Sequence, residues 1–321
     1  MSSTPRDLVG VILAAGRGNR MAPFSKKFPK PILPICNQPL MAYQIKIMQE
    51  VGIQQVFIVV GHLGYEISRL MGDGAHLGVS IHYVEQTEML GIAHAVGQLE
   101  PYLKTPFMLF LGDIFFRSRG MAEAVAAFRS LESGTYLIVK DEPDPEAIKR
   151  NYAVILDQDT GLVRRVIEKP RYIRNRLKGC GIYLFDQHIF DAVRRTPRTA
   201  MRDEYEITNA IQILIDDSEP VHIAQAVAED VNLTFPCDLL RCNLSELDHR
   251  GADNLIHETA LVASGAELRR CVLGPNVRIT GAVQLSHCLL LEDAVVNQTQ
   301  GEISHCIITP ETTIDCRQLL V

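Results

Sequence analysis

Near its N-terminus the chain reads Leu8-Val-Gly-Val-Ile-Leu-Ala-Ala-Gly-Arg-Gly-Asn-Arg-Met21. The uncharged apolar run at its start predicts a buried strand. The small residues and glycines that follow let the backbone bend and approach a phosphate closely. Arg17 and Arg20 lie in the same loop, and Lys30 follows in Lys27-Phe-Pro-Lys-Pro-Ile-Leu-Pro34. Such cations offset the charge that builds on a phosphate under attack. The sequence therefore predicts a phosphate site at the end of the first strand.

Short apolar runs and segments of helical spacing alternate through the first two thirds of the chain. This alternation predicts an α/β fold, with a Rossmann-like, mostly parallel sheet and helices on both faces. Ligands of such sheets bind beyond the carboxyl ends of the strands, so we expect sites in the loops after Leu13 and Leu111. The expected strands are Leu8–Leu13, Gln55–Val60, Ser80–Val84, Phe107–Leu111 and Tyr136–Val139, and the expected helices are Pro39–Val51, Gly64–Met71, Ile92–Leu99 and Met121–Leu131.

After Gly251 the aliphatic residues recur with a period of six, and the count resets by one between Leu268 and Leu273. Helices repeat every 3.6 residues and strands every 2, whereas hexapeptide repeats build a parallel β-helix with triangular coils. We therefore expect two domains, a larger one at residues 1–250 and a short parallel β-helix of about three coils at 251–321. So short a β-helix needs a cap from the larger domain or from a partner. The recurring positions are Ile256, Val262, Leu268, Leu273, Ile279, Leu285, Leu291, Ile308 and Ile314.

The composition is that of an ordinary globular protein, with 47% hydrophobic and 22% charged residues. The formal net charge is −6 and no basic tract stands out, so we expect no nucleic acid partner. The longest apolar runs are strand-sized, and the polar start of the chain does not resemble a signal peptide, so we expect no membrane association. The eight cysteines have no compact spacing. This predicts reduced thiols and a cytoplasmic protein.

The loop after Leu13 is ambiguous when it is taken alone. Gly16-x-Gly18 fits a tight turn with solvated basic residues as well as it fits a phosphate cradle. It lacks the third glycine of the dinucleotide fingerprint and the Lys-Ser/Thr of the nucleotide phosphate loop. Taken with the Pro-Lys and Leu-x-Pro that follow, however, the segment resembles the signature of sugar-1-phosphate nucleotidyltransferases. The resemblance covers roughly residues 8–245, and the hexapeptide tail is typical of the subgroup that carries a left-handed β-helix.

This resemblance implies an enzyme that joins a nucleoside triphosphate to a sugar 1-phosphate, with release of pyrophosphate and use of Mg²⁺. It implies that Arg20 and Lys30 bind the triphosphate. Asn19 stands where the family usually has Thr or Ser, but its amide still donates hydrogen bonds to a phosphate. The other residues that match the family's nucleotide-binding loop are Leu13, Ala14, Ala15, Gly16 and Gly18.

A second motif, Phe107-Met-Leu-Phe-Leu-Gly-Asp-Ile114, places Asp113 directly after an apolar strand. A carboxylate there suits Mg²⁺, although an isolated Asp at such a point often only caps a turn. The resemblance implies that Asp113 is a metal ligand. It also implies a second ligand, Asp230, within Glu229-Asp-Val-Asn232. That match is looser, because Ala228 and Glu229 replace the aromatic residue that often precedes this Asp.

Gln86 and Gly91 in Gln86-Thr-Glu-Met-Leu-Gly-Ile-Ala-His-Ala95 concern the base. In relatives that use UTP or dTTP, a Gln five residues before a Gly contacts the pyrimidine edge. An amide both donates and accepts, as that edge requires. Guanine users often carry an acidic residue at this point. Two alternatives remain. The first is that Gln86 only starts a surface loop, and the second is that the enzyme transfers a guanylyl group. We expect His94 to be structural.

For the sugar phosphate, Val166-Ile-Glu-Lys-Pro170 resembles the family's Glu-Lys-Pro. The resemblance implies that Glu168 accepts from sugar hydroxyls and that Lys169 faces the phosphate nucleophile. Taken alone, the pair would be a solvated strand end. Ala153 replaces the glycine of the family's Tyr-Gly, which leaves the identity of the sugar open. Cys180 and Gly181 match positions that line the sugar site.

In the tail, Arg270-Cys271, His287-Cys288 and His305-Cys306 recur about once per coil. One hypothesis is a Cys/His metal site. We favour the other, ladder packing of small residues, because the ligands of structural zinc sites are usually only a few residues apart in the sequence. We expect the tail to form homo-oligomers, because its last coil and the apolar Leu319-Leu-Val321 would otherwise be exposed. Acyl transfer by the β-helix and a non-catalytic nucleotide-sensing subunit are the rival functions.

Overall fold

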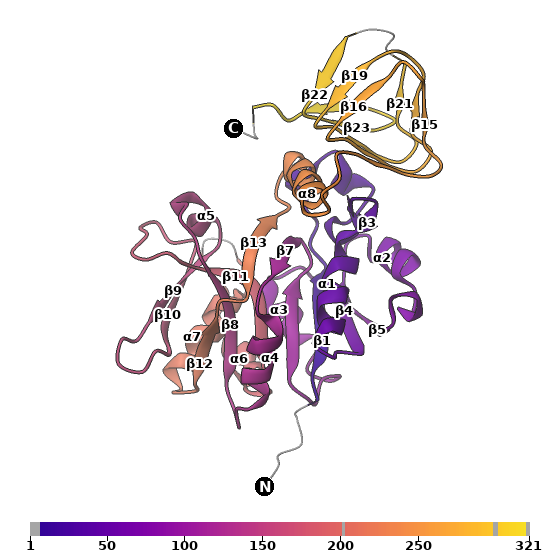
Figure 1. Ribbon diagram of the computed structural model, residues 1–321. Coiled ribbons are helices and arrows are strands. Elements are labelled where there is room, and N and C mark those ends of the chain that lie inside the picture. Colours follow the sequence, from indigo (N-terminus) through magenta and orange to yellow (C-terminus); the bar gives the residue numbers. More distant parts are fainter. Residues whose placement is uncertain (1–6, 201–202, 298–300, 319–321) are drawn as a thin grey trace. The chain divides into compact units, whose positions relative to one another are not determined.

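The computed structural model describes residues 7–200, 203–297 and 301–318 (Figure 1). The chain forms two compact units. The first contains residues up to 17 together with 41–230, and the second contains 18–40 together with 231 onward. Residues 18–40 and the helix before residue 250 thus belong to the same unit as the β-helix strands. The division into domains at residue 250 stays a prediction.

The first unit is built on a nine-stranded sheet with the strand order β10-β9-β11-β6-β1-β4-β5, in which β8 pairs with both β11 and β12. Parallel pairing joins β6, β1, β4 and β5, and Leu13 of β1 lies between Leu111 of β6 and Val59 of β4. Antiparallel β11 and the β9–β10 hairpin continue the sheet. All five expected strands are present. The bounds are β1 Val9–Ala14, β4 Gln55–Val60, β5 Ser80–Glu85, β6 Phe107–Leu111, β8 Thr135–Asp141, β9 Tyr152–Leu156, β10 Val163–Glu168, β11 Leu177–Phe185 and β12 Val221–Ala224.

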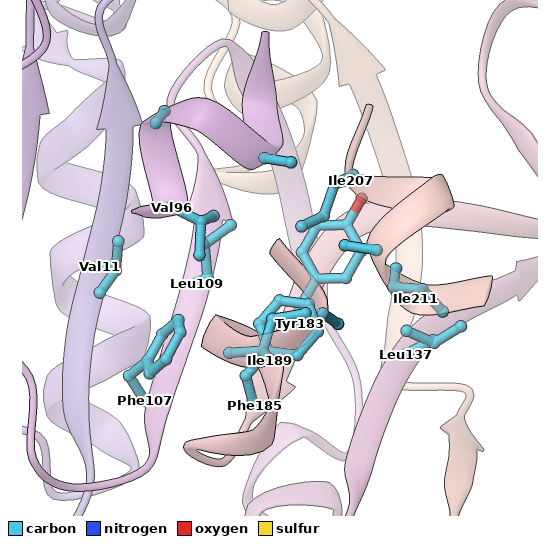
Figure 2. Packing of buried hydrophobic residues seen from close by; sticks show 14 of the residues in the cluster. Val11, Val96, Phe107, Leu109, Leu137, Tyr183, Phe185, Ile189, Ile207 and Ile211 are labelled. Carbon is cyan, nitrogen blue, oxygen red and sulfur yellow. The ribbon is translucent and has the colours of Figure 1, made fainter. Parts of the chain in front are cut away.

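Helices cover both faces of this sheet, as the α/β pattern predicts. On one face, side chains of α3, α6 and α7 pack in a single cluster with Val11, Leu109 and Tyr183 of the strands (Figure 2). The alternate residues Ile12 and Phe110 point to the other face and are also buried. There α4 reaches the end of α1, where the Arg129 guanidinium donates to the Val51 carbonyl at 3.2 Å. The helix bounds are α1 Leu40–Glu50, α2 Gly64–Met71, α3 Ile92–Gly97, α4 Met121–Arg129, α5 Pro145–Arg150, α6 His188–Arg195 and α7 Ile207–Asp216.

The second unit contains a three-sided parallel β-helix, as the period of six predicts. Its sheets have the orders β14-β17-β20-β23-β24, β15-β18-β21 and β16-β19-β22. Leu273, Ile279 and Leu285 point inward and are buried in its core. The strand bounds are β14 Leu255–Ile256, β15 Leu261–Val262, β16 Glu267–Arg269, β17 Val272–Leu273, β18 Arg278–Ile279, β19 Gln284–Ser286, β20 Leu289–Leu290, β21 Val295–Val296, β22 Glu302–Ser304, β23 Cys306–Ile308 and β24 Thr313–Asp315.

Two details of the expected repeat are wrong. The register steps from Leu273 to Leu290 and then to Ile308, so Leu290 occupies the inward position expected for Leu291. The coil from Leu273 to Leu290 has 17 residues, one fewer than three hexapeptides, whereas the coil from Leu290 to Ile308 has 18, so the count of six slips within the first of them. The last coil is also not open, because β24 runs antiparallel to β23 and pairs Ile314 with Ile307. Leu319–Val321, expected to add apolar surface, lie outside the described residues.

The cysteine ladder of the β-helix has the geometry of packing. Cys271, Cys288 and Cys306 are buried, and each thiol donates to the carbonyl two residues earlier in the chain. The His287 and His305 rings beside them stack with centroids 4.5 Å apart. Among residues 7–200, 203–297 and 301–318, no group of three or more His, Cys, Asp or Glu side chains is arranged to hold a metal ion.

A hairpin and a helix complete the second unit. The hairpin strands are β2 (Pro34–Ile35) and β3 (Gln38–Pro39), and the helix is α8 (Pro236–His249). The Asn243 side chain accepts from the Cys36 N–H at 2.7 Å and donates to the Pro34 carbonyl at 3.0 Å, so one buried amide of α8 holds the turn. Asn37 at the tip donates to the Leu273 carbonyl of the β-helix at 2.9 Å.

The expectation that all eight cysteines are reduced is wrong for one pair. Cys237 at the start of α8 and Cys316 after β24 form a disulfide, with Cα atoms 5.4 Å apart. Their separation of 79 residues in the sequence gave no sign of the pairing. The spacing argument for a reducing compartment therefore fails. Within the described part of the chain, no helix combines the length and apolar character needed to span a bilayer.

Candidate active site

Neighbouring strand ends in the parallel part of the sheet bring several predicted site residues together. The Leu13 carbonyl at the end of β1 accepts from the Gly112 N–H at 2.9 Å, and the Ala15 carbonyl accepts from the His62 N–H at 3.3 Å. Asp113 follows Gly112 directly, so it lies at the edge where β1 ends. Ligands of parallel sheets bind at this edge. Leu13, Ala14, Ala15 and Asp113 therefore gather where the sequence places nucleotide and metal.

Gln86 reaches the same edge, because its N–H donates to the Val60 carbonyl at the end of β4 at 2.8 Å. Its side chain is buried, which rules out the alternative of a surface-loop residue. The amide nitrogen lies 2.9 Å from Nδ1 of His94 and 3.4 Å from the Gly91 carbonyl. Within the described residues nothing donates to the Gln86 carbonyl oxygen, so the acceptor half of the amide remains for a ligand.

Gly91 has a structural requirement of its own. Its φ is +110°, and a Cβ at this position would lie 2.6 Å from the Tyr205 carbonyl oxygen. The Tyr205 N–H donates to the Leu90 carbonyl at 2.7 Å, and its carbonyl accepts from the Ala93 N–H at 2.9 Å. Glycine is needed here because two backbone segments touch. The ring of Tyr205 stacks on His94, with centroids 6.2 Å apart, which is the structural role expected of His94.

The residues expected for the sugar phosphate lie at the end of β10. Glu168 accepts from the Thr208 hydroxyl at 3.4 Å, and its carboxylate is 3.9 Å from the Lys169 ammonium. Lys169 has a φ of +41°, and its N–H donates to the Asn151 carbonyl at 2.8 Å. The Lys169 side chain is about half exposed and available to an anion.

Ala153, Cys180 and Gly181 lie further inside the sheet. Ala153 of β9 pairs with Lys178 of β11, and both Ala153 and Cys180 are buried. Burial raises the pKa of the Cys180 thiol, which keeps it protonated and unsuited to nucleophilic attack. Gly181 has a φ of +67°, and a Cβ there would lie 2.8 Å from Leu111 Cδ1.

Arg20, Lys30, Gly18 and Asn19 belong to the second unit. Gly18 has a φ of +62°, and a Cβ there would lie 2.8 Å from Lys30 Cε, so glycine gives room for the lysine stem. The Arg20 guanidinium lies 5.8 Å from the centre of the Phe235 ring, a cation–π distance. Phe235, at the N-cap of α8, is an exposed aromatic residue that the sequence analysis did not assign to the site.

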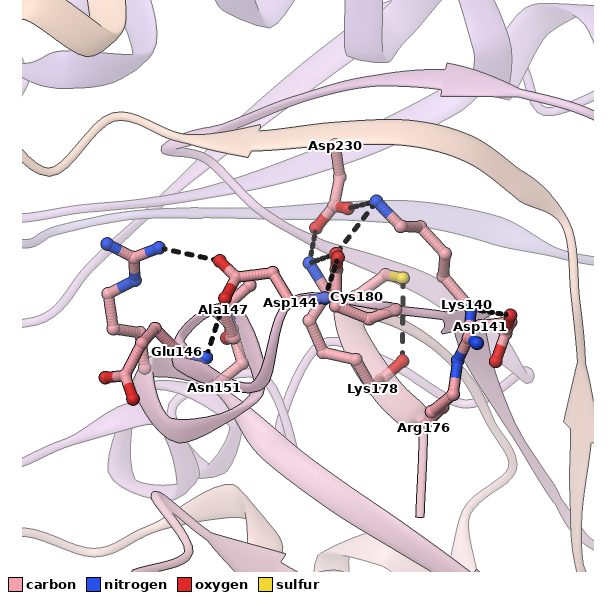
Figure 3. A network of polar contacts seen from close by, with 12 residues as sticks. Lys140, Asp141, Asp144, Glu146, Ala147, Asn151, Arg176, Lys178, Cys180 and Asp230 are labelled. Atoms are coloured by element: carbon pink, nitrogen blue, oxygen red, sulfur yellow. Dashed lines mark hydrogen bonds and ion pairs between the residues drawn. The ribbon is translucent and has the colours of Figure 1, made fainter. Parts of the chain in front are cut away.

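Asp230 has an environment that its sequence did not predict (Figure 3). Its side chain is only 1% exposed, and its Oδ2 accepts from Lys178 at 2.6 Å while its Oδ1 accepts from Lys140 at 3.1 Å. Glu142 approaches the same two ammonium groups, at 3.0 Å from Lys140 and 3.6 Å from Lys178. Buried Lys178, partly buried Lys140 and the two carboxylates thus form a network of zero net charge.

This network bears on the predicted metal site. Asp113, at a strand end, has the chemistry and place of an Mg²⁺ ligand. Asp230 stays a predicted second ligand. Each of its oxygens accepts from one ammonium group, so a cation bound to it would lie close to Lys140 and Lys178.

The network also shifts the pKa values of Lys140 and Glu142. Burial lowers the pKa of Lys140, but Asp230 and Glu142 outweigh this effect, so the pKa is raised overall. Burial likewise raises the pKa of Glu142, but the hydrogen bonds from Lys140 and from the Asp144 N–H hold it below its usual range. Each group therefore keeps its charge over a wider pH range than it would in water.

Lys140, Glu142 and Lys178 are the residues that the sequence analysis missed. One signal was available, because Lys178 stands in the otherwise apolar run Leu177-Lys-Gly-Cys-Gly-Ile-Tyr-Leu-Phe185. A lysine within a buried strand needs a carboxylate partner. The identity of that partner, 52 residues away in the sequence, could come only from the folded chain.

Comparison with known proteins agrees with this geometry. The family described as nucleotidyl transferase matches residues 9–231. The chain belongs to this family. Over 312 residues it is 33% identical to a glucose-1-phosphate thymidylyltransferase of Streptomyces griseus, covering 92% of this chain and 85% of the relative. Over 228 residues it is 30% identical to a UTP–glucose-1-phosphate uridylyltransferase of Haloferax volcanii, covering 71% of this chain and 92% of the relative.

A solved structure has the same fold. It is a UDP-glucose pyrophosphorylase complexed with UDP-glucose, matched with a TM-score of 0.67 at 19% identity over 76% of this chain and 99% of that chain. As a sugar-1-phosphate nucleotidyltransferase, the protein transfers a nucleotidyl group from a nucleoside triphosphate to a sugar 1-phosphate, giving a nucleotide sugar.

Proposed function

We propose that this nucleotidyltransferase uses UTP or dTTP, with glucose 1-phosphate as the first sugar to test. The observation that carries the base preference is buried Gln86, which lies at the same edge of the sheet as Leu13–Ala15 and has an acceptor oxygen left for a ligand. The N3–H of uracil or thymine is a donor that matches this oxygen. The thymidylyl and uridylyl transferases among the relatives support the same choice of base. Both are named for glucose 1-phosphate, which is why this sugar is the first to test.

In the proposed reaction the sugar phosphate oxygen attacks the α-phosphorus directly and pyrophosphate leaves. Arg20 and Lys30 offset the charge on the triphosphate, and Lys169 binds the attacking phosphate. Glu168, Ala153, Cys180 and Gly181 form the surroundings of the sugar. No side chain forms a covalent intermediate, so positioning and electrostatics account for the rate.

We propose Mg²⁺ as the metal and Asp113 as its ligand. When bound, such an ion neutralises phosphate charge. Asp230 is the proposed second ligand, and the positive charges of Lys140 and Lys178 on its oxygens oppose a cation there. We also propose that the enzyme works in the cytoplasm, where nucleoside triphosphates are supplied, and that it self-associates through its β-helix.

Pyrophosphate release measured with five nucleoside triphosphates and several hexose 1-phosphates tests this function. We expect turnover only when both substrates and Mg²⁺ are present, with the highest kcat/KM for UTP or dTTP. A higher kcat/KM for GTP would support guanylyl transfer instead. Triphosphate binding without turnover on any sugar would support a regulatory subunit.

Asp113→Asn and Arg20→Ala test the individual roles. Asp113→Asn should abolish metal-dependent turnover and weaken Mn²⁺ binding measured by titration calorimetry, with the tyrosine fluorescence of the folded state unchanged. Arg20→Ala should lower kcat by about 10²–10³, the cost of removing one donor to transition-state charge. Undiminished activity in either variant would remove that residue from the site.

A further inference from the structure

The first coil of the β-helix, residues 255–269, has an open core. Its strands β14, β15 and β16 each lie at the edge of their sheet. Ile256 and Val262 occupy the inward positions, in register with buried Leu273 and Ile279 of the next coil. Yet Ile256 is 47% and Val262 36% exposed, whereas their counterparts are buried. The inside of the first coil is therefore uncovered.

Among the described residues the other end of the β-helix is better covered. There the inward-facing Val296 is only 5% and Ile308 only 4% exposed, and β24 folds back antiparallel on β23. The disulfide from Cys316 to Cys237 fixes the chain just after β24. Edge strands and open apolar ends are templates for pairing with another chain, and proteins usually cover them. Leu261, which is 64% exposed, adds to the apolar surface of the open coil.

We infer that this first coil docks end to end on the first coil of a second copy of the chain, about a twofold axis. The inference deepens the proposed self-association through the β-helix and does not depend on the proposed substrates.

The geometry of a β-helix end favours an identical partner. Two coils that face each other run in opposite senses, so every pair of edge strands meets antiparallel. A twofold axis perpendicular to the β-helix axis sets one edge strand opposite the same strand of the second copy. The other two edge strands then each lie opposite the other one's copy. With β16 on the axis, β14 lies opposite β15 of the second copy. Apolar Leu255-Ile256 then meets apolar Leu261-Val262, and the exposed inward side chains are covered.

The charges select β16 as the strand on the axis. Its sequence is Glu267-Leu268-Arg269, and both charged side chains are exposed. Antiparallel pairing centred on Leu268 places Glu267 opposite Arg269 of the second copy, and this pair forms twice. Opposite charges on paired strands stabilise a sheet. Placing β14 or β15 on the axis would instead set Glu267 and Arg269 against strands that carry no charge.

Each copy would contribute fewer residues than the roughly 20–30 a side of a standard interface. We therefore expect a reversible dimer with a dissociation constant on the order of micromolar. Sedimentation velocity of the full-length protein from about 1 to 100 µM covers this range.

Charge reversal with rescue is the test. Glu267→Arg alone and Arg269→Glu alone each replace two attractive pairs by two repulsive ones, and should raise the dissociation constant about tenfold or more. The double variant E267R/R269E restores complementarity and should return it to within about threefold of the wild type. Arg278→Glu is the matched control, since it reverses an exposed charge on β18 of the second coil and should leave the dimer unchanged.

Ile256→Lys provides a second test, because it places a charge in the open core at a half-exposed position and should give a monomer. A wild-type monomer at 100 µM would overturn the inference, as would a dimer that none of these variants weakens. All the variants should retain pyrophosphate release. Absence of turnover in a wild type that forms the dimer would refute the proposed function and leave this inference standing.

Discussion

Replacing Lys178 by Met tests whether the buried network holds the first unit together. Lys178 is 4% and Asp230 1% exposed, and their charged atoms are 2.6 Å apart. Removing one partner of a buried ion pair costs about 3–5 kcal/mol, because the remaining charge is left uncompensated. Lys140 still lies 3.1 Å from Asp230 in the variant, so we expect the lower end, about 3 kcal/mol.

Tyrosine fluorescence during urea unfolding is the assay. The protein has no tryptophan, and all nine tyrosines lie between residues 41 and 230, so the signal reports the first unit alone. The matched control is Arg176→Met, just before the same strand. It breaks an exposed pair with Asp141 at 2.6 Å, in which the arginine is 59% exposed. Exposed pairs contribute about 0–1 kcal/mol.

A double-mutant cycle sharpens the result. Lys178→Met combined with Asp230→Asn removes both charges, and Lys140 and Glu142 remain as a neutral pair 3.0 Å apart. The double variant should therefore be more stable than Lys178→Met alone, with a coupling energy of at least about 1 kcal/mol. The reasoning is refuted if Lys178→Met costs no more than Arg176→Met, or if the two substitutions at Lys178 and Asp230 are simply additive.

Three further predictions concern the base, the pH and the disulfide. Gln86→Glu should lower kcat/KM for UTP and dTTP more than it lowers kcat/KM for GTP, because an ionised carboxylate cannot donate to His94 Nδ1 and the Gly91 carbonyl and so loses the contacts that orient the amide toward the pyrimidine edge; an equal loss for all triphosphates would remove Gln86 from base selection. Because the pKa of Glu142 is lowered in the folded state, its contribution to the free energy of unfolding is present above the usual glutamate range and is lost as the pH falls through the folded pKa. The raised pKa of Lys140 gives a contribution that is present below the usual lysine range and is lost as the pH rises through the folded pKa. The destabilisation caused by Glu142→Gln, measured by urea unfolding, should thus shrink below about pH 4 and stay constant near neutrality. Cys316→Ser opens a loop closed across 79 residues and should destabilise the second unit by about 3–4.5 kcal/mol, measured by far-ultraviolet circular dichroism, while tyrosine unfolding of the first unit is unchanged.

The expected fold follows from local patterns that a linear sequence carries. The run at the start of the chain predicted β1 because a short apolar run that ends in small residues and glycines has the length of a buried strand. The period of six predicted the β-helix because each coil repeats the same inward contacts. Its exact register did not follow, since turns absorb a residue without any change in the pattern, and Leu290 therefore replaced Leu291.

Some features of the candidate site could likewise be predicted from the sequence, and others could not. Gln86 and Asp113 follow apolar strands, and parallel strands carry their ends to one edge, so their proximity to Leu13 was predictable from order alone. The partners of Asp230 were not, because Lys140 and Lys178 are 90 and 52 residues away. The Cys237–Cys316 disulfide is equally remote. Sequence by itself determined the five strands and four helices expected within residues 8–139 and the repeat of the β-helix, since these depend on neighbours along the chain. Only tertiary structure decided which charges neutralise each other and which end of the β-helix stays open, because those contacts join segments that no local pattern relates.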